Sequence, residues 1–512
     1  MAGGSATLEA MVPASSPSSR QELSPLLRSV VKVLCVSDAP DFDQPWQTQG
    51  PASGFGSGCI IATARGPRVL TNAHCIANQV FVEVRRYGNA QKYCAEIEAV
   101  GHACDLALLH VDDPSFFHGT TPIELGLVPR LSDRVSVCGY PIGGDRISIT
   151  EGIVSRIELV KFAQSGRSLL AVQIDAAVNV GNSGGPVIKD GRLVGVAFQA
   201  LDEADQIGYM ISPPIVEHFL RDVERGEHDG FPDLGVAVQP LESRAHRRSV
   251  GLPASRPGGI VVTRVVHGGP GDGVFLPGDV LLEVDGIEIA SDGTVPLREG
   301  ELIDFSHVVA MRHVGERMPF TVWRDGRERT CTVELMPPKP LVADHRIGTP
   351  PRYFVIGGLL LVPLTREYLK TWGESWWTAA PRELVALSEQ GVRAPERHEP
   401  VLLQKVLADR GNQGYHDLAN LLVVEVDGFA VRSLAHLVEL VEASRGDFLR
   451  LRTDDGRIIV IHRTEARDRH EAILSKYGVP FDRSVDLRKL ARVAPPVDSA
   501  LGEPRRIAAA SA

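Results

Sequence analysis

The chain has 512 residues, of which 43% are hydrophobic and 23% charged, and this composition excludes a largely disordered or collagen-like protein. At roughly 100–200 residues per domain, the length predicts about three domains. The 54 basic and 64 acidic residues give a net charge of −10, so the composition indicates no nucleic-acid and no membrane partner.

Residues 1–28 are rich in Ser, Pro and Ala and are expected to form a disordered tail. They show no basic head followed by an apolar stretch, so a secretory signal is not expected. Glu9 and Glu22 argue against a transit peptide, a segment type that is poor in acidic residues. We therefore expect an intracellular, soluble protein that is cytoplasmic or nuclear rather than organellar.

Residues 29–228 are expected to form one domain built mainly from β-strands. Short apolar runs, such as residues 68–73 and 105–111, alternate with Gly, Pro, Asn and Asp. This spacing is typical of an all-β barrel or sandwich. Residues 215–223 carry a helical pattern and close the domain.

Two further modules are expected at residues 229–338 and 339–466, followed by a C-terminal tail, residues 467–512, that is biased towards Arg, Pro and Ala. In the first of these modules, Asp325 and Gly326 stand between alternating apolar runs, which predicts a β-hairpin.

The third module partly repeats the second. Asp427 and Gly428 follow the apolar run LLVVEV, just as Asp285 and Gly286 follow VLLEV, and a helical pattern comes after each pair. This likeness indicates a diverged internal duplication.

The longest apolar run, residues 353–364, lies in this third module. It is shorter than the ~20 residues that a membrane-spanning helix needs. Gly357, Gly358 and Pro363 interrupt it, so we expect a buried strand rather than a membrane span.

Three residues of the first domain have the pattern of a nucleophilic hydrolase. His74 lies just past a strand, Asp105 opens the next strongly apolar strand, and Ser183 lies in a Gly-rich loop. Such chemistry needs a nucleophile, a base that takes its proton, and a carboxylate that orients the base. Taken alone, each residue also has a structural interpretation. His74 could be a structural histidine, Asp105 a turn residue, and the loop of Ser183 a flexible turn. Their combination and order in one β-rich domain favour catalysis.

The glycines around Ser183 bear on the same chemistry. They let the backbone N–H groups of Gly181 and Ser183 converge on one point. Two such donors can stabilise an oxyanion, which is usually the largest single contribution to this kind of catalysis.

The motifs TNAHC, DLALL and GNSGGP resemble the catalytic motifs of trypsin-like serine proteases. With the modules that follow, the chain resembles the HtrA/Deg family, and most of all the plant-type Deg proteases with a degenerate second PDZ domain. GYPIGGD, QIDAAVNVGNSGGP and PPRYFVIGGLLLVPL carry this resemblance, which extends over about residues 29–465. It implies a mainly β fold, with a trypsin-like double β-barrel protease domain followed by two PDZ-like α+β domains.

The resemblance also implies residue roles. His74 would be the general base, Asp105 its orienting carboxylate and Ser183 the nucleophile of an acyl-enzyme mechanism. The loop formed by Gly181, Asn182 and Ser183 would hold the oxyanion.

The expected activity is that of a serine endopeptidase that cleaves unfolded or damaged proteins without ATP and acts in protein quality control. It would assemble as a homo-oligomer and need no cofactor. The lack of a P-loop motif in the sequence is consistent with ATP independence. Ala177, six residues before the nucleophile, would form the base of the specificity pocket, so cleavage after Lys or Arg is not expected. The alternative is a PDZ-dependent chaperone or scaffold whose protease domain is resting or inactive.

A PDZ domain adds the C-terminus of its ligand as a strand and binds the carboxylate with backbone N–H groups. In the first PDZ-like module, Leu234, Gly235 and Val236 are the candidates for binding such C-terminal peptides. Asp233 places a negative charge nearby and weakens this assignment. The second module lacks a comparable loop and is expected to act as an assembly or regulatory surface.

The seven cysteines form no CxxC pair, so no metal site is expected, and they are too sparse for a disulfide scaffold. Cys59 and Cys75 flank the strand before His74 at the spacing of a disulfide known in chymotrypsin-type enzymes. We interpret them as two small buried thiols. The alternative is a bridge that steadies His74 under oxidising conditions.

Overall fold

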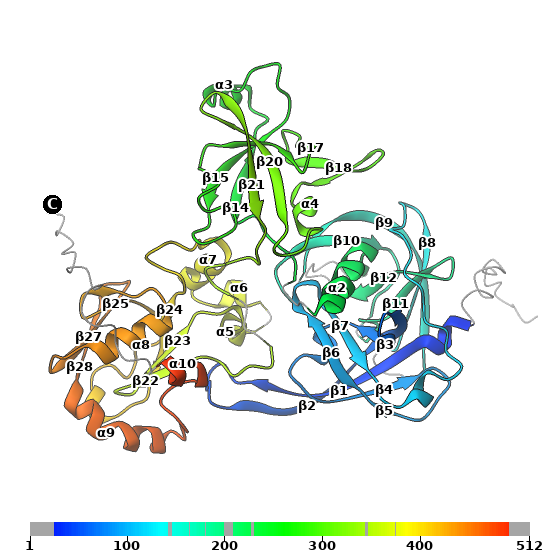
Figure 1. Cartoon of the computed structure of the whole chain (residues 1–512). Helices are drawn as coiled ribbons and strands as arrows, with labels where there is room; N and C mark the ends of the chain where they lie inside the picture. Colours follow the sequence, from blue (N-terminus) through cyan, green and yellow to red (C-terminus); the bar gives the residue numbers. More distant parts are fainter. Residues whose placement is uncertain are drawn as a thin grey trace, which may run out of the picture. The chain divides into compact units, whose positions relative to one another are not determined.

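The computed structural model describes residues 25–141, 146–162, 164–179, 181–198, 208–226, 230–343, 347–373 and 375–490 (Figure 1). Almost all of the predicted N-terminal tail lies outside these residues. The chain divides into two compact units, and each is described by itself. The first unit comprises the described parts of Met1–Ser37, Ala52–Phe231 and Pro296–Val314, and the second comprises those of Asp38–Pro51, Pro232–Val295 and Gly315–Ala512.

A seven-stranded sheet forms the first part of the first unit, with the strand order β5-β4-β1-β2-β3-β7-β6. Apolar side chains alternate inward along its strands, and Val33, Val69, Leu109 and Phe116 lie in its buried core. The strands are β1 (Val30–Pro40), β2 (Thr48–Thr63), β3 (Gly66–Thr71), β4 (Gln79–Arg86), β5 (Tyr93–Cys94), β6 (Glu96–Gly101) and β7 (Leu106–His110).

A closed barrel forms the second part of the first unit, with the strand order β10-β13-β12-β11-β8-β9. Its strands are β8 (Arg134–Gly139), β9 (Ser148–Lys161), β10 (Ser168–Ile174), β11 (Pro186–Lys189), β12 (Arg192–Phe198) and β13 (Gly208–Ile211). Helix α2 (Pro213–Arg225) follows β13 and packs against β10 and β12. The predicted β-rich domain with a closing helix is therefore confirmed.

The first PDZ-like module is divided between the two units. Its sheet belongs to the second unit and has the order β14-β15-β16-β20-β21, with β17 paired to β16. The segment Pro296–Val314, which contains helix α4 (Ser306–Ala310), belongs to the first unit. The other elements are β14 (Val236–Pro240), α3 (Arg244–Ser249), β15 (Ile260–Val265), β16 (Val280–Val284), β17 (Ile287–Glu288), β18 (Thr294–Arg298), β19 (Glu301–Asp304), β20 (Arg317–Arg324) and β21 (Arg327–Glu334).

The second PDZ-like module has a seven-stranded sheet with the order β22-β23-β24-β25-β27-β28, and β26 pairs with β25. Its strands are β22 (Phe354–Ile356), β23 (Leu359–Pro363), β24 (Val401–Val406), β25 (Leu421–Val426), β26 (Phe429–Ala430), β27 (Phe448–Thr453) and β28 (Ile458–His462). Its helices are α5 (Arg366–Leu369), α6 (Trp376–Ala379), α7 (Arg382–Gln390) and α8 (Leu434–Ala443).

The internal duplication is visible in the turns and in the strand order. Asp285-Gly286 joins β16 to β17, and Asp427-Gly428 joins β25 to β26, with positive φ at all four residues. Positive φ at both central residues defines the type I′ hairpin turn. The strand order β14-β15-β16-β20-β21 of the first module corresponds to the order β23-β24-β25-β27-β28 of the second. Strand β22 is therefore an additional strand of the second module.

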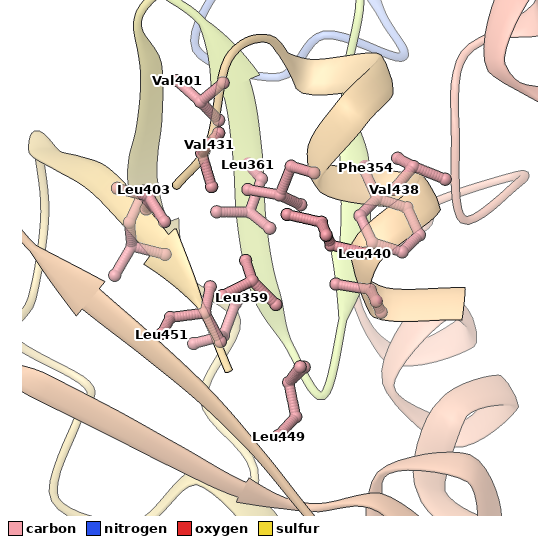
Figure 2. Close-up of a cluster of buried hydrophobic side chains, with 14 of the residues drawn as sticks. Phe354, Leu359, Leu361, Val401, Leu403, Val431, Val438, Leu440, Leu449 and Leu451 are labelled. Atoms are coloured by element: carbon pink, nitrogen blue, oxygen red, sulfur yellow. The ribbon is translucent and has the colours of Figure 1, made fainter. Parts of the chain in front are cut away.

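The apolar run at residues 353–364, which we predicted as a buried strand, forms the hairpin β22–β23. Its inward side chains, Phe354, Leu359 and Leu361, point toward Val438 and Leu440 of helix α8 (Figure 2). These residues are 0–8% exposed and belong to the main hydrophobic core of the module. No helix in the described ranges is long and apolar enough to cross a membrane.

The tip of the β1–β2 hairpin, residues 38–51, packs within the second unit. Phe42 and Trp46 lie against an apolar cluster of the second PDZ-like module, and the Trp46 ring meets Tyr353 edge to face. The buried amide of Gln404 donates hydrogen bonds to the carbonyl groups of Phe42 and Asp43, at 3.1 and 3.0 Å.

The C-terminal tail that we expected from residue 467 is helical in its described part. Helix α9 (Arg463–Lys476) runs through the predicted boundary, and α10 (Val485–Leu490) follows it. Ile473, Leu474 and Leu487 are buried in the cores of the module and fix both helices. Because these apolar residues stand among many charged ones, the composition of the segment concealed their packing.

Candidate active site

His74 and Asp105 are brought together from two neighbouring strands. His74 begins the turn that follows β3, and Asp105 lies just before β7, which pairs with β3. The His74 Nδ1 atom lies 2.7 Å from Asp105 Oδ2. This contact fixes the orientation of the imidazole ring and leaves its Nε2 atom to act on a substrate or nucleophile.

Asp105 is held from several directions. Its Oδ1 atom accepts the backbone N–H of His74 at 2.9 Å, and its carbonyl accepts the Asn72 amide at 2.8 Å and the Ala73 N–H at 3.1 Å. The residue is 2% exposed and has a φ of 55°, which is unusual for a non-glycine residue. Such backbone strain is typical of residues fixed for function.

The electrostatic environment favours protonation of His74. Burial alone would lower its pKa, but the Cys75 sulfur and the hydrogen bond and negative charge of Asp105 together raise the pKa well above its ordinary value. A base with a raised pKa accepts a proton readily, as a general base in acyl transfer must.

Ser183 lies beside this pair on the loop between β10 and β11. Its carbonyl accepts the Ser57 N–H at 2.8 Å and lies 3.6 Å from Cys75 Sγ, so the loop is anchored next to His74. Within the described part of the chain, no hydrogen bond joins the Ser183 hydroxyl to His74. Catalytic hydrogen bonds are often long in ligand-free enzymes and shorten when substrate binds.

The three residues expected around the oxyanion differ in their hydrogen bonding. The Asn182 N–H donates to the Asn179 carbonyl at 2.9 Å and is therefore occupied. The N–H groups of Gly181 and Ser183 donate no hydrogen bond to any of the residues that the structure describes. Gly181 and Ser183 are thus the available donors of the predicted loop, and Asn182 instead stabilises the turn.

Gly184 permits the close packing of this loop. Its φ is +83°, and a Cβ atom there would lie 2.2 Å from the Ser57 carbonyl and 2.5 Å from Thr71 Oγ1. No larger residue fits, because both neighbours are fixed by the strands. The glycine after the nucleophile is therefore required to bring Ser183 against β2 and β3.

Ser57 is a positioning residue that the sequence analysis did not identify. Its hydroxyl donates to the Gly181 carbonyl at 2.7 Å and accepts the Tyr140 N–H at 2.8 Å. Its N–H binds the Ser183 carbonyl. It lies in the motif GFGSG, which is visible in the sequence, but its role depends on contacts with residues more than 80 positions away.

The candidate peptide-binding loop of the first PDZ-like module is partly occupied. The Gly235 N–H donates to the Asp233 carboxylate at 2.6 Å, so this carboxylate stands where a ligand carboxylate was expected. Leu234 is 6% exposed and Gly235 has a φ of +66°. Strand β14, which follows the loop, lies at the edge of its sheet.

In the described part of the second PDZ-like module, the corresponding strand is not at the edge of its sheet. Its strand β23 corresponds to β14, but it pairs with β22 through Phe354, Val355 and Ile356. The position where a ligand strand would be added is therefore filled by the chain itself. This pairing agrees with the expectation that the second module is not a peptide reader.

One group of side chains in the described residues is close enough to be considered for a metal. His218 and Asp222 of α2 and His313 after α4 are buried, with ligand atoms within 4.8 Å of one another. The rings of His218 and His313 stack at 4.2 Å and 29°, so their lone pairs run side by side rather than converge on one ion. His313 Nδ1 lies 2.6 Å from Asp222 Oδ1, and we interpret the group as a hydrogen-bonded clamp on the segment 296–314.

Cys59 agrees with the interpretation as a buried thiol, whereas Cys75 is half-buried. Cys59 and Cys75 are both free in the structure, and Cys59 is fully buried. Burial and the neighbouring Cys138 strongly raise the pKa of the Cys59 thiol, which keeps it protonated.

Comparison with known proteins supports each of the three modules. Residues 56–196 match the family model of the trypsin-like peptidase domain, and residues 232–335 and 342–486 each match a PDZ domain model. The last match extends beyond residue 466, in agreement with the packing of α9 and α10.

Relatives of Arabidopsis thaliana match along most of the chain. Protease Do-like 2, chloroplastic, is 37% identical over 465 residues, which cover 90% of this chain and 75% of the relative. Protease Do-like 4, mitochondrial, is 37% identical over 90% of this chain and 85% of the relative. These names, and that of a third, mitochondrial relative, contradict the prediction of a cytoplasmic or nuclear location and point to an organelle. The prediction was wrong because it rested on two acidic residues in the first 28.

Among solved structures, an HtrA-type protease AlgW variant with decapeptide is 26% identical, with a TM-score of 0.50. The match covers 63% of this chain and 98% of that protein. The mainly β fold, with a trypsin-like domain followed by two PDZ domains, is therefore confirmed. The chain belongs to the Do-like (HtrA/Deg) family of serine proteases.

Proposed function

We propose that His74, Asp105 and Ser183 are the catalytic triad of this serine endopeptidase. The observation that carries the proposal is the 2.7 Å contact between His74 Nδ1 and Asp105 Oδ2, beside the loop that holds Ser183. The contact leaves Nε2 as the only ring atom that can take the proton of the Ser183 hydroxyl.

In the first half of the reaction, Ser183 Oγ bonds to the carbonyl carbon of the substrate while its proton moves to His74 Nε2. The carbonyl oxygen becomes an oxyanion, which the N–H groups of Gly181 and Ser183 stabilise. The carbon–nitrogen bond then breaks, and His74 gives its proton to the leaving amine. The product is an acyl-enzyme on Ser183.

In the second half, a water molecule attacks the acyl carbon and gives a proton to His74. The new oxyanion collapses, and the proton returns to Ser183 Oγ as the acid leaves. Asp105 stays ionised throughout and stabilises the imidazolium that forms twice. No step requires ATP.

We further propose that the substrates are unfolded or damaged proteins and that the chain works as a homo-oligomer. An unfolded polypeptide can take the extended shape that an acyl-transfer site accepts. The free edge of β14 supports a role for the first PDZ domain in binding an extended C-terminal segment. Because the Gly235 N–H is already bonded to Asp233, that carboxylate would have to move when a ligand carboxylate binds.

The experiment is degradation of a denatured model protein without ATP, with wild-type protein compared with Ser183→Ala. We expect fragments only from the wild type. Ser57→Ala is a second variant, because it removes the hydroxyl that connects Gly181 to Tyr140 and should reduce kcat while leaving the fold intact. Intact substrate in every reaction, or equal cleavage by Ser183→Ala, would contradict the proposal.

A further inference from the structure

Five basic side chains of the second unit gather where three segments meet: the turn after β15, the loop before β24 and the turn before α8. We call them the basic cluster, and its members are His267, Arg393, His398, Arg432 and His436. The His267 N–H donates to the Arg393 carbonyl at 3.4 Å, and the His398 N–H donates to the Arg432 carbonyl at 2.9 Å. The cluster therefore combines a residue of the first PDZ domain with four of the second.

The side chains of the basic cluster lie close enough to affect one another. The rings of His267 and His398 stack with their centroids 5.8 Å apart. Burial lowers the pKa of His398, and the nearby cations of the cluster lower it further. The pKa of His436 is lowered in the same way, by burial and then by Arg432 and His398. Positive charge is thus concentrated here, in a chain with a net charge of −10.

The two arginines of the basic cluster have no counter-ion. No carboxylate of the described residues forms an ion pair with the guanidinium of Arg393 or of Arg432. The Arg393 Nε atom is buried and donates to no atom in the described part of the chain. A buried donor without a partner costs free energy, and a bound anion would recover that cost.

Two carboxylates lie next to the basic cluster, and both have other partners. Asp272 Oδ2 lies 3.2 Å from His267 Nδ1, so it engages the histidine at the edge of the cluster. Glu399 Oε1 accepts a hydrogen bond from Arg352 at 2.7 Å, and Glu399 Oε2 accepts the Leu434 N–H at the start of α8 at 3.0 Å. Neither carboxylate neutralises the two arginines.

The donors of the basic cluster match a tetrahedral oxyanion. A guanidinium presents pairs of N–H groups that fit phosphate oxygens. His436 Nδ1 accepts the Arg432 N–H at 3.3 Å, so the neutral ring carries its proton on Nε2 and can donate there. A phosphate group with a charge of about −1.5 to −2 at neutral pH would balance both arginines, whereas a single carboxylate would leave one uncompensated.

We propose that the basic cluster is a phosphate-binding site, in which Arg393 and Arg432 bind the oxyanion and His398 and His436 donate further hydrogen bonds. Inorganic phosphate and the phosphate group of a phosphorylated peptide share this chemistry. Because the cluster includes residues of both PDZ domains, a bound phosphate would hold their adjoining loops together. The proposal does not depend on the proposed triad, because its test measures binding and not cleavage.

The test is isothermal titration calorimetry of the full chain with inorganic phosphate at neutral pH and constant ionic strength. We expect saturable binding with one site per chain. Arg393→Gln and Arg432→Gln should each raise the Kd about tenfold, equivalent to about 1.4 kcal/mol. Arg432 is exposed, so its replacement does not endanger folding. Absence of saturable binding, or an unchanged Kd in both variants, would overturn the proposal.

Arg445→Gln is the matched control, because it removes the same charge from an exposed arginine of the same domain. Arg445 lies just beyond the other end of α8, whose ten residues extend about 15 Å from the turn that holds Arg432. This variant should bind phosphate as tightly as the parent chain. An equal loss of affinity in Arg445→Gln and Arg432→Gln would mean that phosphate responds only to overall charge, and it would reject the site.

Proton uptake gives a second readout that is specific to the histidines. A bound dianion raises the pKa values of His398 and His436, which are lowered in the free protein, so binding near pH ~6 should take up protons. Sulfate is the probe here, because it is a tetrahedral dianion that does not itself titrate in this range. Titration in two buffers with different ionisation enthalpies measures the uptake. The double variant His398→Gln/His436→Gln should abolish it, and an unchanged uptake would contradict the assignment.

A last comparison identifies the source of the phosphate. A fluorescent peptide with one phosphoserine and the same peptide with serine are titrated with the Ser183→Ala chain, and anisotropy is measured. Tighter binding of the phosphopeptide, lost in Arg432→Gln, supports the site with a phosphorylated polypeptide as its ligand. Equal binding of both peptides, together with saturable binding of inorganic phosphate that Arg432→Gln weakens, supports the site with the free ion as its ligand.

Discussion

His74 Nδ1 lies 2.7 Å from Asp105 Oδ2, while the other oxygen of the same carboxylate accepts the backbone N–H of His74 at 2.9 Å. One side chain thus fixes both the ring and the backbone of the proposed base. The arrangement selects the tautomer in which Nδ1 carries the proton and Nε2 is free to accept one.

The first prediction concerns this pair. Asp105→Asn keeps the size of the side chain but favours the wrong tautomer of His74, so kcat should fall by about 10⁴-fold. The far-UV circular dichroism spectrum should not change. A loss below tenfold in steady-state peptide hydrolysis would show that Asp105 does not orient the base.

The second prediction is a pH dependence. Catalysis needs neutral His74, and Asp105 and Cys75 hold the His74 pKa above its ordinary value against the opposing effect of burial. The acidic limb of kcat/KM should therefore lie above pH ~6.5, with activity rising as the pH increases. An NMR titration of the imidazole in Ser183→Ala measures the same pKa directly.

The raised pKa also affects stability. Because the folded protein binds the His74 proton more tightly than the unfolded chain, the pair stabilises the fold fully below the unfolded pKa of about 6.5. This contribution is lost as the pH rises through the folded value. A midpoint for His74 at or below pH ~6.5 would contradict both statements.

The third prediction tests the hairpin that fills the edge of the second PDZ domain. A Cβ atom at Gly358 would lie 2.3 Å from Asn412 Nδ2 and 2.5 Å from the Leu407 carbonyl, at a φ of +83°. Gly358→Ala should destabilise the domain by roughly 3 kcal/mol, because backbone strain and a clash with fixed atoms combine. Calorimetric unfolding of the full chain measures this as a lower transition temperature.

Gly456→Ala is the matched control for that variant. Its φ is +86°, but no atom lies within 4 Å of the added methyl group. It should cost only the backbone strain of about 1–2 kcal/mol. Equal losses for the two variants would contradict the tight packing of the turn between β22 and β23.

The fourth prediction concerns the clamp between α2 and the segment 296–314. His313→Ala removes one partner of a buried pair and leaves the Asp222 carboxylate without its 2.6 Å contact. Leaving a buried polar group without its hydrogen-bond partner costs about 1–3 kcal/mol. Hydrogen exchange of the segment 296–314 should therefore become faster. His118→Ala, which replaces an exposed histidine of the same unit, should leave the exchange unchanged. Unchanged exchange in His313→Ala would reject the clamp.

Local patterns were sufficient to predict much of this molecule. The motifs around His74, Asp105 and Ser183 each fit within a few residues, and so do the Asp-Gly turns that mark the duplication. The repeated module could be recognised because its turns keep the residues that tolerate positive φ.

Other features depend on contacts between distant segments and leave no local signal. The hydrogen bonds of Ser57, the packing of Phe42 and Trp46 in the second unit, and the clamp at His313 each join residues at least 80 positions apart. The location was predicted wrongly because composition is a weak guide to targeting.

The most direct test of the account is covalent labelling with a fluorophosphonate, followed by peptide mass mapping. Ser183 should carry the adduct in the wild type, at a rate that rises with pH. His74→Ala should react far more slowly, and Ser183→Ala should not react. An adduct on another residue, or an equal rate in His74→Ala, would contradict the assignment of Ser183 as a nucleophile activated by His74.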